Sequence, residues 1–137
     1  MINVKDQVYA ALRKKLGEEI EITDSYPKTW SSLPAVQYVE EENRVWEHTD
    51  GKEQKAYCRY RIDIWHNAST SAIALQVDDA IAALGLQRTG CGDVDDPSGL
   101  KHKMMRYEMI IDVHTEQVYS VAERRRYYVS KWCKTWL

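Results

Sequence analysis

The first hydrophobic pattern along the chain is helical. Apolar side chains recur at three- and four-residue intervals from position 4 to position 16: Val4, Val8, Ala11, Leu12 and Leu16. This spacing lines one face of an amphipathic helix, which Gly17 is expected to end. The pattern returns in residues 73–84, after a Ser/Thr run at 69–71 that offers candidate N-caps, and stops at Gly85. The sequence therefore predicts two amphipathic helices.

The other apolar segments alternate with polar residues, which is the pattern of half-buried strands. Five segments are predicted to be strands: residues 19–23, 35–46, 56–66, 86–93 and 105–113. Within residues 56–66 one face carries Cys58, Tyr60, Ile62 and Ile64, and the other carries Arg59, Arg61 and Asp63. This alternation predicts a sheet with one buried side.

The connections between these segments define the fold class. Residues 24–34 contain two prolines and read as a loop, and residues 49–52 (Thr-Asp-Gly-Lys) predict a tight turn within a long β-hairpin. Strands joined by short turns form hairpins, and the two helices must cover one face of the resulting sheet. We therefore predict an α+β fold in a single domain of residues 1–119, followed by a basic, aromatic C-terminal extension at 120–137.

Composition and charge narrow the function classes. The 137 residues are 44% hydrophobic and 29% charged, with a net charge of −2, so no global attraction to nucleic acid is expected. The sequence has no apolar stretch typical of a signal peptide or a membrane span, which predicts a protein that stays in the cytoplasm and has no membrane partner. Three widely spaced cysteines, Cys58, Cys91 and Cys133, predict reduced thiols.

Candidate catalytic and metal motifs are weak. The acidic run that begins at Asp93 departs from a calcium-binding loop, because Pro97, Ser98 and Met104 occupy positions that need a ligand, glycine and glutamate. His66 and Asp63 could act as a base and its orienting group, but no nucleophile motif accompanies them. Phosphate-binding glycine motifs are absent as well. We therefore expect no enzyme activity, no metal and no cofactor.

Two charged features remain. Glu40, Glu41 and Glu42 put negative charge on both faces of one predicted strand. They fit either a solvated sheet edge or an acidic surface that lines a passage in an assembly. The C-terminal extension contains a basic arm formed by Arg124, Arg125 and Arg126. This arm could meet an acidic neighbour or a phosphate backbone, and the tyrosines and tryptophans around it favour packing on this domain or on another chain.

Four segments resemble a known family. They are the N-terminal amphipathic helix, the strand opening at 34–39 (Pro-Ala-Val-Gln-Tyr-Val), the strand 60–66 that runs into a Ser/Ala-started helix, and the hairpin through 95–108. Together, across about residues 1–119, they resemble the tail-completion (tail-terminator, head–tail joining) proteins of long-tailed bacteriophages. The extension after Tyr119 is longer and more basic than the family pattern.

The resemblance implies a mostly antiparallel mixed sheet flanked by helices, and a structural protein with no catalytic residue. It implies a monomer or weak oligomer in solution that becomes a hexameric ring on the tail. That ring caps the tail tube protein and docks on the head connector protein, while DNA passes through without specific binding. The implied location is the virion, after assembly in the host cytoplasm.

We assign hypothetical roles to particular residues on this basis. Polar loops that each contain a tryptophan are expected to supply ring or partner contacts. The residues assigned to these contacts are Trp30, Trp46, His48, Asp50 and Lys52. The acidic strand of Glu40, Glu41 and Glu42 is expected to face the lumen, where negative charge keeps DNA sliding. Three alternatives remain: another phage neck or minor head protein, a nucleic-acid-binding module that uses its basic arm, and a small hydrolase.

Overall fold

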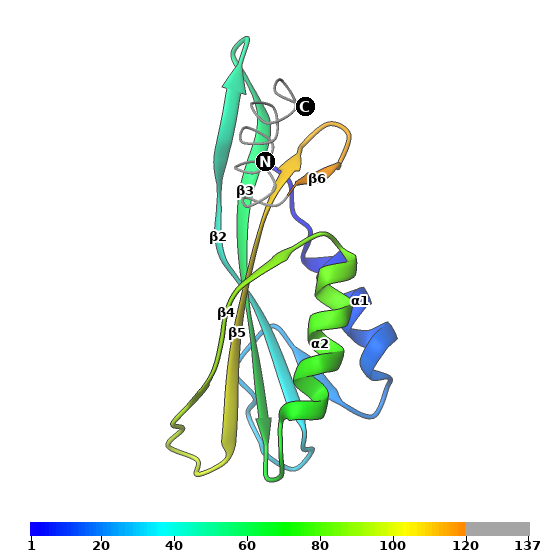
Figure 1. Cartoon of the computed structure of the whole chain (residues 1–137), viewed down its shortest axis with the longest axis vertical. Helices are drawn as coiled ribbons and strands as arrows, with labels where there is room; N and C mark the ends of the chain where they lie inside the picture. The colour runs from blue at the N-terminus through cyan, green and yellow to red at the C-terminus, as the bar shows by residue number, and fades with distance from the viewer. Residues whose placement is uncertain (120–137) are drawn as a thin grey trace, which may run out of the picture.

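A computed structural model describes residues 1–119 (Figure 1). The elements in chain order are α1 (Lys5–Leu16), β1 (Glu21–Thr23), β2 (Ala35–Thr49), β3 (Lys52–His66), α2 (Ser71–Ala83), β4 (Gln87–Val94), β5 (Lys101–Asp112) and β6 (Val118–Tyr119). Two helices and one six-stranded sheet confirm the predicted α+β class.

The sheet is mixed and mostly antiparallel. Its strand order is β1-β2-β3-β5-β4, and β6 pairs with the end of β5. Only β1 and β2 pair in parallel, and every other pair is antiparallel. The chain leaves β3, crosses through α2 to β4 at the sheet edge, and then returns as β5 between them. Strands far apart in sequence therefore become neighbours.

Both helices lie on the same face of the sheet and contact each other (Figure 1). Val8 and Leu12 of α1 and Ile81 of α2 are fully buried against Tyr60 of β3 and Tyr107 of β5. Burial of each such aliphatic side chain stabilises the fold by about 1.5–3 kcal/mol. The predicted helix faces are thus the faces that form the core.

The β2–β3 hairpin is longer than the alternation alone predicts. Each strand has 15 residues, and the turn between them is formed by Asp50 and Gly51, with φ angles of 55° and 71°. Two successive positive φ angles produce the type I′ turn, whose twist matches that of the paired strands. The hairpin projects beyond the helices at one end of the molecule (Figure 1).

Three details differ from the sequence expectations. β1 begins at Glu21 instead of residue 19, and β6 was not predicted, because two or three residues carry no periodic signal. Asp63 is 3% exposed, although the alternation placed it on a solvent face. The 24–34 loop places Tyr26 and Trp30 against Trp65, on the second face of the sheet, which is the face that the helices do not cover. Part of the second face is therefore covered too.

Candidate interaction surfaces

The tip of the β2–β3 hairpin is the most protruding part of the described chain. β5 stops pairing with β3 at Lys55, and the Val113 N–H donates to the Gln54 carbonyl just beyond it, so residues 47–53 have no third strand beside them. His48, Asp50 and Lys52, which we predicted as contact residues, are all exposed there. The structure thus brings three of the five predicted contact residues together at one accessible tip.

Trp46 lies just below that tip and packs within the hairpin. Its ring stacks on Tyr57 with 6.0 Å between centroids, and the Arg44 guanidinium lies 5.4 Å from the Trp46 centroid and 4.4 Å from the Tyr57 centroid. Such ring and cation–π contacts are worth about 0.5–1.5 kcal/mol each. Trp46 therefore stiffens the hairpin as well as contributing to its half-exposed surface.

Trp30 lies at the opposite end of the molecule from Trp46. Its ring centroid is 5.5 Å from that of Trp65 and 5.6 Å from that of Tyr26, which itself lies 5.4 Å from Trp65. Tyr26 remains 55% exposed. The two predicted tryptophans therefore belong to separate surfaces, and Trp30 holds the 24–34 loop against the sheet.

The acidic strand residues are in the middle of β2, next to a β-bulge. Pairing shifts register between Glu40 and Glu42, so Glu41 has no partner residue on β3. Glu40 accepts a hydrogen bond from the buried Tyr60 hydroxyl at 2.9 Å. Because of the bulge, Glu41 and Glu42 both meet arginines instead of alternating between faces.

Glu41 is the centre of an arginine cluster. Its carboxylate lies 3.0 Å from Arg106 Nε, 3.4 Å from Arg61 Nη1 and 3.4 Å from Arg59 Nε, and its side chain is 14% exposed. Burial acts to raise its pKa, but the hydrogen bond from Arg106 and the charges of all three arginines hold the pKa of Glu41 below its ordinary value. Glu42 pairs with Arg44 at 2.8 Å as well as with Arg59. The acidic strand is therefore largely neutralised within the fold.

The sequence pattern did not predict a second polar cluster, which lies around Asp63. Asp63 does not pair with His66, because residues three apart on a strand point to opposite faces. Its partners are Arg61, whose Nε donates to Asp63 Oδ2 at 2.7 Å, and His102, whose Nε2 lies 2.8 Å from Asp63 Oδ1. The His102 ring stacks on Trp65 at 4.5 Å, and its Nδ1 lies 3.5 Å from Asp96 Oδ1. The β3–β5 register, which sets Trp65 opposite His102, brings these residues together.

This Asp–His–Asp cluster has a clear structural role. Trp65 Nε1 donates to Asp96 at 3.1 Å, so the β4–β5 turn is tied to β3. Burial opposes ionisation of Asp96, yet hydrogen bonds from Ser98 and Trp65 hold the pKa of Asp96 below its ordinary value. Among residues 1–119, no serine, threonine or cysteine side chain hydrogen-bonds to His102. The hydrolase alternative named His66, whose Nδ1 accepts a hydrogen bond from the Asn67 N–H, and that alternative stays a prediction.

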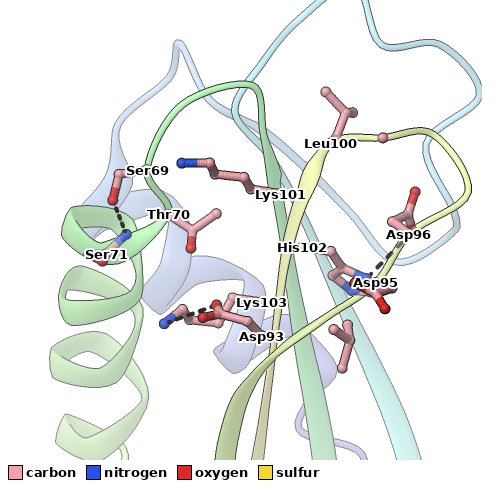
Figure 2. A pocket seen from close by; sticks show the side chains of 12 residues that line it. Ser69, Thr70, Ser71, Asp93, Asp95, Asp96, Leu100, Lys101, His102 and Lys103 are labelled. Atoms are coloured by element: carbon pink, nitrogen blue, oxygen red, sulfur yellow. Dashed lines mark hydrogen bonds and ion pairs between the residues drawn. The ribbon is translucent and has the colours of Figure 1, made fainter.

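An open cleft of about 680 Å³ lies between the first turn of α2 and the adjoining ends of β4 and β5 (Figure 2). The predicted turn at 95–99 forms one of its borders. Asp93 forms an ion pair with Lys103 at 3.4 Å instead of converging with the other carboxylates of this segment. Within the described chain, no group of three or more His, Cys, Asp or Glu side chains is arranged to hold a metal ion.

The basic arm of Arg124, Arg125 and Arg126 lies outside the described residues. The nucleic-acid-binding alternative that rests on it therefore stays a prediction. Neither α1 nor α2 is long and apolar enough to cross a membrane. The sequence matches no protein-family model and no curated protein.

Proposed function

We propose that this chain is a structural assembly protein of a long-tailed phage. It would form a ring that caps the tail tube and joins the tail to the head connector, without catalytic activity. The observation that carries this proposal is the projecting β2–β3 hairpin. A stiff hairpin that extends past its own core buries little within its own chain, which suits a surface that docks on a partner.

The edges of the sheet support self-association in a ring. A ring requires two different patches that meet head to tail. Within residues 1–119, β4 pairs on only one side, with β5, and β2 beyond Gln37 pairs only with β3. These two open edges are on opposite sides of the sheet. They also differ chemically, since the β4 edge carries Gly90 and Gly92 between Arg88 and Asp93, whereas the β2 edge carries the consecutive acidic residues 40–42.

The hairpin tip offers the direct test. Replacing residues 48–53 with a short Asp-Gly turn should lower the unfolding midpoint of the domain only slightly, because these residues pair in the described sheet only with each other, and the ion pair from Glu53 to the rest of the chain involves an N-terminal ammonium that is 81% exposed. The variant should fail to join heads to tails when added to particles that lack the protein, counted by electron microscopy. Normal yield of joined particles from a folded variant would refute the role of the hairpin.

A single charge reversal sharpens this test. Lys52→Glu changes an exposed lysine at the tip, and Lys14→Glu changes an exposed lysine on α1 as its matched control. We expect reduced joining only for the Lys52 variant, because charge reversal at a contact surface slows or blocks docking. Equal activity of the two variants would place the contact elsewhere.

The lumen hypothesis for the acidic strand requires its own variant. Because arginines surround Glu41, reversal of that residue would disturb the fold, and Glu42 is the better probe. If Glu42 faces a DNA passage, Glu42→Lys should slow DNA release from assembled particles, since the added positive charge attracts phosphates. Unchanged release kinetics in intact particles would count against a lumenal position.

A further inference from the structure

The start of α1, the end of α2 and β6 meet at one end of the helical layer (Figure 1). Together with β5 they enclose an apolar cleft of about 230 Å³. Val4 of α1's first turn, Leu84 at the end of α2 and Val118 of β6 are among the side chains that line it. Typical small-molecule sites measure about 300–1,000 Å³. This cleft is therefore sized for one large side chain and not for a drug-sized ligand.

The walls of this apolar cleft are preformed. Val8 of α1 and Met109 and Ile111 of β5 are at most 2% exposed, so the core fixes their positions. The two polar residues that line the cleft, Gln7 and Glu116, are both exposed. An apolar hollow with a polar rim suits a side chain that has an apolar body and a polar tip, as tryptophan does.

The C-terminal extension of residues 120–137 begins beside this cleft, although it lies outside the described residues. Val118 lines the cleft, and the extension starts two positions later. An extended chain spans up to about 3.3–3.6 Å per residue, so the second half of the extension can reach back to the cleft. A tethered segment also has an effective concentration in the millimolar range, which favours it over a separate molecule.

The extension matches the domain in both charge and polarity. It carries five basic side chains and one acidic one, whereas the whole chain has a net charge of −2, so residues 1–119 carry a net charge of −6. Opposite net charges attract the extension to its own domain. Its second half contains four large aromatic residues, Tyr127, Tyr128, Trp132 and Trp136. Such side chains are unfavourable in water and gain by entering an apolar cleft.

We propose that the C-terminal extension folds back on its own domain and places the indole ring of Trp132 or Trp136 in the apolar cleft. The indole N–H then has an acceptor at the rim in the Glu116 carboxylate or the Gln7 side-chain carbonyl. Docking of the tryptophans also holds the basic arm of residues 124–126 near the acidic domain. This inference concerns the chain's own extension and does not depend on ring assembly.

Disulfide trapping in the full chain provides the test, because Cys133 follows Trp132 directly. In a Cys91→Ser background, Gln7→Cys adds a thiol at the exposed rim of the cleft, while Cys58 stays buried. A disulfide requires Cα atoms within about 7 Å of each other. With oxidised glutathione, the Gln7→Cys variant should form an intramolecular disulfide to Cys133 at least roughly tenfold faster than the control Lys52→Cys, whose thiol is at the exposed hairpin tip.

Methyl NMR spectra of the full chain without added cysteines give a second measurement. Trp132→Ala or Trp136→Ala should shift the methyl signals of Leu84 and Val118, because the ring current of the docked indole is lost. The methyl signals of Ile73, at the other end of α2, should stay in place.

Three outcomes would overturn the proposal. Equal trapping rates for the Gln7→Cys and Lys52→Cys variants would show that the extension does not prefer the cleft. Unshifted Leu84 and Val118 methyl signals in both tryptophan variants would show that neither ring occupies it. A disulfide between two chains, formed at a rate that rises with protein concentration, would identify a second copy as the occupant.

Discussion

Replacement of Glu41 by glutamine is the most informative perturbation of this fold. The change keeps the size of the side chain but removes the negative charge that Arg59, Arg61 and Arg106 share. Arg106 would then lose the carboxylate that it binds, whereas Arg59 keeps Glu42 at 3.2 Å and Arg61 keeps Asp63 at 2.7 Å. The fold, and not the surface alone, should therefore be weakened.

The magnitude follows from the contacts. Arg106 donates to Glu41 at 3.0 and 3.3 Å, and hydrogen bonds to charged groups contribute about 1.5–3 kcal/mol. The arginines are 30–40% exposed, which weakens the Arg59 and Arg61 pairings to at most about 0.5 kcal/mol each. We expect a loss of about 2 kcal/mol, or roughly 6–10 °C in melting temperature for a domain of this size.

Urea unfolding followed by tryptophan fluorescence measures this loss, with an unchanged m-value as evidence that the two end states are preserved. Glu42→Gln is the matched control on the adjacent residue. The Glu42 side chain is 33% exposed and its partners Arg44 and Arg59 are 49% and 38% exposed, so its loss should cost at most about 0.5–1 kcal/mol. Equal effects of the two substitutions would refute the special role of Glu41.

Three further outcomes are expected. Burial raises the pKa of the Cys58 thiol to about 11, so iodoacetamide at pH 8 should modify exposed Cys91 and spare Cys58 until the protein unfolds. Gly85→Ala should destabilise the domain by about 1–3 kcal/mol, because the φ angle of Gly85 is 97° and a β-carbon there would lie 2.9 Å from a β6 valine methyl group. Gly92→Ala, the matched control, should be nearly neutral. Two backbone N–H groups hold the pKa of Asp112 below its ordinary value, so its stabilising contribution should be complete above about pH 4 and lost as pH falls through the lowered pKa.

Each of these outcomes has a measurement that can contradict it. Mass spectrometry in a Cys133→Ser background would show modification of native Cys58 if that thiol were accessible. Equal melting temperatures for the Gly85 and Gly92 variants would mean that the left-handed backbone at Gly85 carries no strain. Asp112→Asn should flatten the acid side of the stability profile, and an unchanged profile would rule out the hydrogen-bonded carboxylate as a contributor.

The sequence determined the elements whose signals are local. Helical spacing identified α1 and α2, alternation identified the long strands, and Asp50-Gly51 identified the hairpin turn. Each of these patterns is produced by side chains within a few residues of one another, so it can be read without knowledge of the rest of the chain. The α+β class followed from their order.

Tertiary structure alone decided which charged and polar groups meet. Glu41 finds Arg106 at a separation of 65 residues, and Asp63 finds His102 at a separation of 39. These pairs depend on strand register, on the bulge in β2 and on the crossover that places β5 beside β3. Register is selected by packing of the whole core, which no local pattern encodes. For that reason the acidic strand looked unpaired in the sequence and is neutralised in the fold.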